Sequence, residues 1–155
     1  MRPFLRLSWP WAGLVCLVLT CLTLGCQPSG PVELPASPVR CVQCQMTVAD
    51  PRFVVQEHTT KGRVLFFDSV ECAQRYAMEH RDQIRRVYLR SFLDPPRWIE
   101  GGKAWVVRWA GIRSPMGGNL AAFASREEAR AWLESMGAGS GEFSVRRWSE
   151  LNAQE

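Results

Sequence analysis

Two ten-residue stretches of the chain resemble each other at a spacing of 56 residues. Residues 67–76 (FDSVECAQRY) align with residues 123–132 (FASREEARAW), with four identities and an aromatic residue at the end of both. Such repetition indicates a duplicated structural unit, although helix-capping chemistry shared by the two stretches is an alternative explanation. Each half of the chain is too small to bury a core by itself. We therefore expect two similar units that pack together and leave a cleft between them.

The order of predicted elements is ββαβ in both units, which makes the chain an α+β protein. In the first unit, residues 41–96, the apolar pattern predicts strands over 53–58, 63–67 and 86–90, with a helix that begins at Asp68 or Ser69. In the second unit, residues 97–155, it predicts strands over 103–109, 119–123 and 142–146, with a helix from the capping box at 125–128 to Gly137.

The N-terminal segment has the order of a secretory signal peptide. Arg2 and Arg6 precede an uncharged stretch over 11–25, which is shorter than the ~20 residues needed to span a bilayer. Cys26 follows in a context similar to a bacterial lipobox, although Thr23 and Leu24 depart from the usual pattern, and an ordinary cleaved signal is the alternative. We expect a cleaved signal peptide over 1–25, acylation of Cys26, and a proline- and serine-rich tether over 26–40.

Charge and residue types disfavour two functional classes. Removal of the leader takes away two of 19 basic residues and none of the 15 acidic ones, so the mature protein is nearly neutral. It has no basic tract interleaved with aromatic residues, which disfavours nucleic acid as a partner. The chain has only two histidines, and we find no Ser-His-acid arrangement and no glycine-rich phosphate loop. The sequence therefore predicts a binding protein rather than an enzyme.

Residues 41–46 (CVQCQM) bring together two thiols and a thioether, Cys41, Cys44 and Met46. Soft sulfur ligands of both kinds favour Cu(I) over Zn²⁺. Three alternatives remain: a zinc site that adds Cys72 and His58, a redox-active thiol pair, and a simple disulfide. The redox pair is disfavoured because the residues after Cys44 do not begin a helix that would lower its pKa.

Residues 114–118 (SPMGG) form the second candidate region. Met116 lies between a proline and two glycines, so it cannot belong to a buried helical stripe, and we interpret it as a ligand. Met46 would share a face with Cys44 in an extended stretch, as a ligand or as a core residue. Cys72 lies in the first helical turn, where the macrodipole stabilises a thiolate; it is either a third ligand or a small buried thiol.

These motifs resemble the NosL family, the accessory lipoproteins associated with copper supply to nitrous oxide reductase. The resemblance rests on residues 41–46 followed by Asp50 and Pro51, on residues 62–68 (GRVLFFD) with Cys72, and on residues 114–117 with 122–123. It implies two ββαβ units and one Cu(I) bound through sulfur ligands, with imidazole as a further candidate. One departure is Gln45, because glycine is common at this position in the family.

The sequence therefore predicts an extracytoplasmic, lipid-anchored Cu(I) chaperone. The candidate ligands are Cys41, Cys44 and Met116, followed by Met46, Cys72 and His58. The expected partners are a cuproprotein acceptor, with nitrous oxide reductase implied by the resemblance, a membrane copper or ABC transporter, and the bilayer through Cys26. The alternatives are a zinc-stabilised adaptor and a thiol-disulfide oxidoreductase that acts on a copper site.

Overall fold

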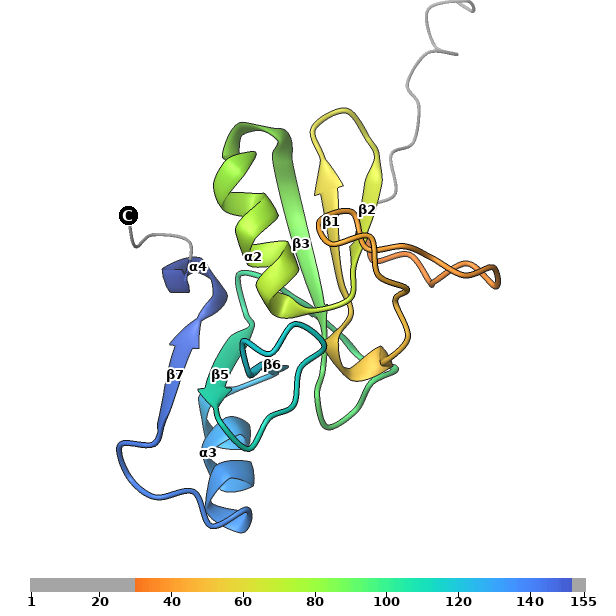
Figure 1. Ribbon diagram of the computed structural model, residues 1–155. Helices are drawn as coiled ribbons and strands as arrows, with labels where there is room; N and C mark the ends of the chain where they lie inside the picture. Colours follow the sequence, from red (N-terminus) through yellow and green to blue (C-terminus); the bar gives the residue numbers. More distant parts are fainter. Residues whose placement is uncertain (1–29, 152–155) are drawn as a thin grey trace, which may run out of the picture.

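The computed structural model describes residues 30–151, which form two antiparallel sheets with helices packed against them (Figure 1). The first sheet has the order β2-β1-β3-β4 and the second the order β6-β5-β7. The strands are β1 (Val55–Thr59), β2 (Val64–Phe67), β3 (Ile84–Arg90), β4 (Trp98–Glu100), β5 (Trp105–Trp109), β6 (Leu120–Phe123) and β7 (Phe143–Arg147). The helices are α2 (Val70–Glu79), α3 (Arg126–Ser135), α4 (Trp148–Leu151) and the short 3-10 helices η1 (Pro51–Phe53) and η2 (Arg81–Gln83).

The repeated stretches occupy equivalent places in the two halves. The first half runs β1-β2-α2-β3 and the second β5-β6-α3-β7, which is the predicted order in both cases. Ser69 and Ser125 are the N-caps of α2 and α3, and their side chains accept hydrogen bonds from the amides of Cys72 (3.2 Å) and Glu128 (3.0 Å). The mixed α+β class and the order of elements in each half are therefore confirmed, and the shared capping chemistry has the same structural role in both halves.

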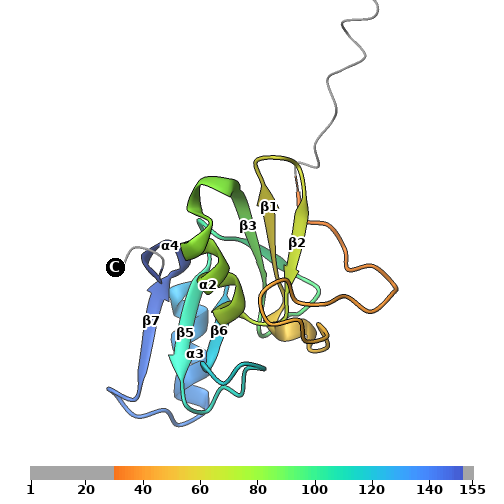
Figure 2. The same ribbon diagram turned by 45° about the horizontal axis from the view of Figure 1, so that its top comes forward.

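The two halves share apolar cores, as expected for units that cannot fold alone. The core under α2 contains Val55, Phe67 and Leu89 of the first sheet together with Val106 and Leu120 of the second. The core under α3 is built mainly from the second half, but it also takes in Phe53 of η1. Figure 2 shows α2 and α3 beside the second sheet, so that α2 lies between the two halves.

Besides the short 3-10 helices η1 and η2, one strand and one helix were not predicted from the sequence. Strand β4 pairs with β3 through Arg90 and Trp98, Leu89 and Ile99, and Tyr88 and Glu100, so the first sheet extends past residue 96. Helix α4 follows β7 and buries Trp148 in the core under α2. Both elements are too short, at three and four residues, to show a hydrophobic period in the sequence.

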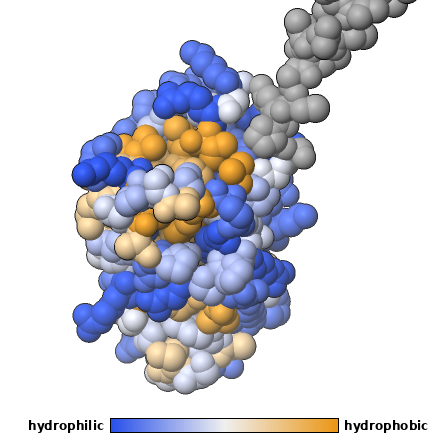
Figure 3. Space-filling view, turned by 90° about the vertical axis from the view of Figure 1, so that its right-hand side faces the viewer, coloured by the Kyte–Doolittle hydropathy of each residue, from blue (hydrophilic) through white to orange (hydrophobic). Residues whose placement is uncertain are grey.

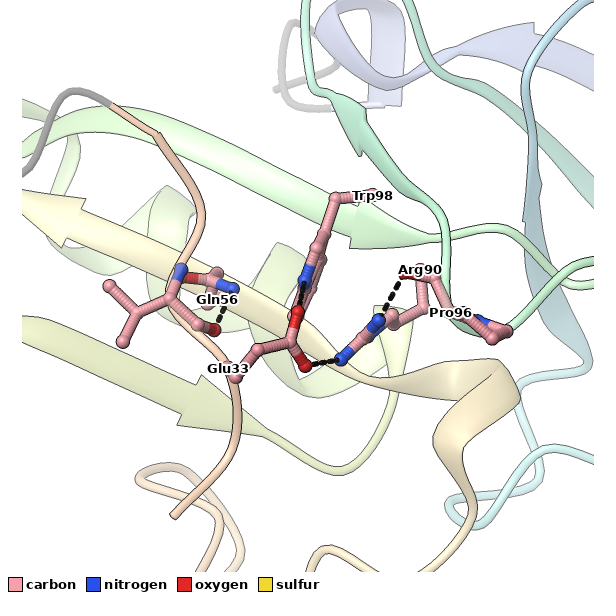
Figure 4. Close-up of polar contacts among 6 residues, drawn as sticks. Glu33, Gln56, Arg90, Pro96 and Trp98 are labelled. Carbon is pink, nitrogen blue, oxygen red and sulfur yellow. Dashed lines mark hydrogen bonds and ion pairs between the residues drawn. The ribbon is translucent and has the colours of Figure 1, made fainter.

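The segment before the sulfur motif is bound to the first sheet (Figure 4). The side-chain amide of Gln56 exchanges two hydrogen bonds, both 2.9 Å, with the backbone N–H and C=O of Val32. The carboxylate of Glu33 forms an ion pair with Arg90 (2.7 Å) and accepts a hydrogen bond from Trp98 Nε1 (3.3 Å). Val32 and Glu33, within the predicted tether, therefore lie against the sheet.

Other predictions for the N-terminus are not covered by the structure. The signal peptide over 1–25 and the acylated Cys26 lie outside the described residues. Among residues 30–151, no helix is long and apolar enough to cross a bilayer.

Figure 3 shows one face of the molecule, with apolar surface in its upper part bordered by polar residues. The large apolar side chains that are exposed in the described structure are Val32, Met46, Leu93, Met116 and Met136. Two of these five, Met46 and Met116, are sulfur ligands predicted from the sequence.

Candidate metal centre

The sulfur motif lies at the tip of a tight chain reversal. Val48 N–H donates to Val39 C=O (2.9 Å), and Cys41 N–H donates to Met46 C=O (2.8 Å). Inside this loop, Gln45 N–H donates to Cys41 C=O (3.0 Å), and Gln45 has a positive φ of 64°. A glycine adopts this left-handed conformation without steric cost, whereas Gln45 holds it with some backbone strain.

The structure brings four potential metal donors together. The Sγ atoms of Cys41, Cys44 and Cys72 and a carboxylate oxygen of Asp68 lie within 4.8 Å of one another, and we call this set the cysteine cluster. Cys44 Sγ also donates a hydrogen bond to Asp68 Oδ2 (3.4 Å). All three cysteines are free thiols in this structure.

Local structure explains how residues 24 or more positions apart meet. Val42 N–H donates to Phe66 C=O (3.0 Å), which fixes the loop against the end of edge strand β2. Asp68 follows β2 directly, and the Ser69 cap starts α2 so that Cys72 lies in its first turn. The cluster therefore forms where one loop, one strand end and one helix start converge (Figure 1).

The cluster is shielded from water. Cys41, Asp68 and Cys72 are 0%, 2% and 4% exposed, and Cys44 is partly exposed. Burial is the main cause that raises the pKa of the Cys41 thiol and, more strongly, that of the Cys72 thiol. In the metal-free protein, desolvation of Cys72 therefore opposes the thiolate that its place in the first helical turn would favour.

The unpaired oxygen of Asp68 points to a cation. Asp68 Oδ1 is buried and has no hydrogen-bond partner, which is costly unless something else satisfies it. A metal ion supplies the positive charge that lets buried thiols lose their protons. The residues present therefore fit a bound metal. Three sulfur donors favour a soft ion such as Cu(I), whereas the full set of three cysteines and one carboxylate also satisfies tetrahedral Zn²⁺.

The Met116 loop lies beside this cluster. Its turn is closed by Gly117 N–H donating to Ser114 C=O (3.0 Å), and Gly117 has a positive φ of 71°. A cleft of about 600 Å³ is lined by Met116 from this loop and by Cys72 and Glu71 from α2. The structure therefore brings the Met116 loop and one cluster cysteine to a common cleft.

The other predicted ligands are placed differently. Met46 is 48% exposed, and because Cys44 lies in a turn, these two residues do not share the face of an extended stretch. His58 is on the same face of β1 as Gln56, whose Oε1 is 2.9 Å from His58 Nε2. That face is opposite to the one α2 covers, so the structure does not bring His58 to the cysteine cluster.

Sequence reasoning missed two residues of this region. Asp68 was considered as a helix cap and as the end of the 62–68 motif but not as a metal donor, although its place directly before the Ser69 cap puts it one helical turn from Cys72. Glu71 was not singled out at all. It accepts hydrogen bonds from Ser114 Oγ and from Leu120 N–H (3.1 Å), both in the second half of the chain. No local sequence pattern predicts such a contact between units.

The fold and the site define a small α+β protein with a buried cluster of thiols whose residues fit a metal ion. The NosL family model matches residues 31–151, so the chain belongs to the NosL family and the resemblance noted in the sequence is confirmed. The chain is also similar in fold to the copper chaperone NosL from Shewanella denitrificans, with a TM-score of 0.65 and 20% identity over 79% of this chain and 96% of that one. Comparison with curated proteins gives no match.

Proposed function

We propose that this chain is an extracytoplasmic Cu(I) chaperone that binds one copper ion at the cysteine cluster and delivers it to a cuproenzyme. The observation that carries the proposal is the convergence of Cys41, Cys44 and Cys72 with a partnerless, buried Asp68 oxygen. Membership of the NosL family and the similarity to a copper chaperone support copper as the cargo.

The residues of the site have different roles in binding and releasing the ion. The three thiols supply the strong soft donors, and binding displaces their protons. In the metal-free protein Asp68 accepts a hydrogen bond from the Cys44 thiol, and its carboxylate is a fourth potential donor to the ion in a site that is largely shielded from water. The thioethers of Met46 and Met116 lie at exposed positions, where a neutral ligand can join or leave the ion without a proton. This is binding and transfer of cargo, not catalysis.

A competition titration tests the proposal. We expect the reduced mature protein to take one Cu(I) per monomer from a Cu(I) chelator, and Cys44→Ser to bind Cu(I) at least tenfold more weakly, because it loses a thiolate donor. Met136→Leu is the matched control, since Met136 is 53% exposed and lies at the end of α3, outside both the cluster and the cleft. Unchanged affinity in Cys44→Ser would remove the cluster from the copper site.

Zinc is the second candidate, and the set of three cysteines with Asp68 is the observation that favours it. A zinc-stabilised adaptor would retain Zn²⁺ through purification and would lose folding stability when a chelator removes it. A Cu(I) chaperone would instead remain folded without metal and would exchange bound Zn²⁺ for Cu(I). Unfolding upon zinc removal would therefore favour the adaptor.

The cellular setting belongs to the same proposal. The leader over 1–25 and Cys26 support export and lipid anchoring, and the family supports nitrous oxide reductase as the acceptor, with a membrane copper or ABC transporter as a further partner. Cys26→Ala should shift the protein from the membrane to the soluble fraction. Identical fractionation of Cys26→Ala and wild type would exclude the lipid anchor.

A further inference from the structure

The α2 residue next to Cys72 connects the two halves of the molecule. Glu71 Oε1 accepts hydrogen bonds from Ser114 Oγ and from Leu120 N–H, and Ser114 Oγ in turn accepts one from Asn119 N–H (2.9 Å). These contacts bracket Met116 on both sides. The loop that carries the thioether is therefore fastened to the start of α2.

The backbone of this loop is shaped for the same contact. A Cβ added at Gly118 would collide with the Glu71 side chain, so the loop can approach α2 this closely only with glycine at that position. Glu71, Cys72, Met116 and Gly118 all line the one cleft. Cys72 is the only member of the cysteine cluster among the residues that line it in the described structure.

A comparison of the two similar halves shows that the contact of Glu71 with the Met116 loop has no counterpart at the equivalent position of α3. Glu127 holds the equivalent position in α3, second in the helix like Glu71, and it lies exposed at the surface. A glutamate at this position therefore suits the start of either helix through its charge, but only Glu71 reaches into the other half. Capping chemistry alone does not account for the contact with Ser114 and Leu120.

One oxygen of Glu71 is unused by the protein. Oε2 is buried and has no hydrogen-bond partner, whereas Oε1 accepts both hydrogen bonds from the second half. The contact with the loop therefore depends on one acceptor oxygen.

We propose that Glu71 is a positioning residue that holds the Met116 thioether at the mouth of the cysteine cluster, so that Cu(I) reaches Cys72 through this cleft. The inference rests on the proposed function, because it assigns a role to Glu71 in the same copper site. Glu71 acts through Met116 and is not a copper ligand.

A double-mutant cycle on Cu(I) affinity tests this role. Glu71→Ala and Met116→Leu should each weaken Cu(I) binding, by on the order of tenfold as for other supporting residues of metal sites. The double variant should be no weaker than either single variant, because Glu71→Ala already removes the benefit of Met116. Additive losses, or normal affinity in Glu71→Ala, would overturn the proposal.

Three further variants separate positioning from folding. Glu71→Gln keeps an oxygen acceptor for Ser114 and Leu120 and should restore nearly wild-type affinity, whereas Ser114→Ala removes one donor from the other side and should weaken binding without altering Glu71. Glu127→Ala is the matched control and should leave copper affinity unchanged. If Glu71→Ala fails to fold, Ser114→Ala paired with Met116→Leu provides the same cycle, and additivity there contradicts the proposal equally.

The two hypotheses fail in different ways. If the wild-type protein binds no Cu(I), the proposed function is wrong. If wild type binds Cu(I) normally but the cycle is additive, the copper chaperone stands and only the role of Glu71 is lost.

Discussion

The protonation of Glu57 should make the protein more stable in mild acid than at slightly basic pH. Glu57 is fully buried in β1, on the face that packs under α2, with Leu65 and Val87 directly opposite on the neighbouring strands. Both carboxylate oxygens lack hydrogen-bond partners. Burial raises the pKa of Glu57 from 4.5 to about 8, because the ionised form loses its hydration.

The size of the effect follows from the linkage between protonation and folding. Below pH 4.5 Glu57 carries a proton in both the folded and the unfolded state, and its contribution is greatest there. Between pH 4.5 and about 8 only the unfolded state releases the proton, so the free energy of unfolding falls by about 1.4 kcal/mol for each pH unit. The total loss is about 5 kcal/mol, a large share of the stability of a typical domain.

Urea unfolding of the reduced, metal-free protein at pH 5 and pH 8 should show about 4 kcal/mol of this loss. Glu57→Gln removes the titrating group, so its free energy of unfolding should change much less between the two pH values than that of wild type. The amide introduced by Glu57→Gln also lacks a hydrogen-bond partner and lowers stability, but this cost is the same at both pH values. It therefore cancels when the two pH values are compared within each protein. Glu134→Gln, at an exposed position of α3, is the control and should follow wild type. Parallel pH profiles for wild type and Glu57→Gln would refute the reasoning.

Three other predictions follow from the fold. Gln45→Gly should stabilise the protein by about 1 kcal/mol in urea unfolding, because glycine relieves the positive φ; a loss of stability would show that the hydrogen bond from Gln45 Nε2 to Val42 C=O matters more. Ser69→Ala and Ser125→Ala should each cost about 1 kcal/mol in the same assay, and markedly unequal losses would contradict their equivalence. Glu33→Gln should speed hydrogen exchange at the Val32 amide while changing global stability by less than about 1 kcal/mol, and unchanged exchange would mean that Gln56 alone holds the segment.

The sequence predicted the elements that local chemistry determines. The Ser69 and Ser125 caps and the apolar face of each helix specified α2 and α3 to within a residue or two at their starts. Strand alternation specified β1 to β3 and β5 to β7 in the correct order. These features depend on residues close together in the chain, so the pattern alone is sufficient.

The metal centre was predicted only in part. The CxxC spacing identified Cys41 and Cys44 as candidates, and the place of Cys72 in the first helical turn made it a candidate third ligand; the structure brings all three together. Asp68 and Glu71 were missed because their roles arise from contacts with the sulfur loop and with the Met116 loop. The strength of burial was missed for the same reason, since desolvation of Cys72 depends on packing from both halves.

The position of His58 away from the cysteine cluster could have been predicted from the sequence. Period-two alternation along β1 places it with Gln56 and opposite to Val55, which faces the core under α2. Applied strictly, that alternation separates His58 from a helix-borne Cys72. No such signal was present for the tether. Its contacts with the sheet, from the Gln56 amide to Val32 and from the Arg90 guanidinium to Glu33, cannot be predicted from its composition.

X-ray absorption at the copper edge of the reduced, Cu(I)-loaded protein identifies the atoms that bind the ion and so tests the cysteine cluster as the copper site. We expect one Cu(I) per monomer with a first coordination shell of sulfur, and a smaller sulfur count when Cys41, Cys44 or Cys72 is replaced by serine. A shell dominated by nitrogen or oxygen, or a spectrum that the cysteine variants leave unchanged, would contradict it.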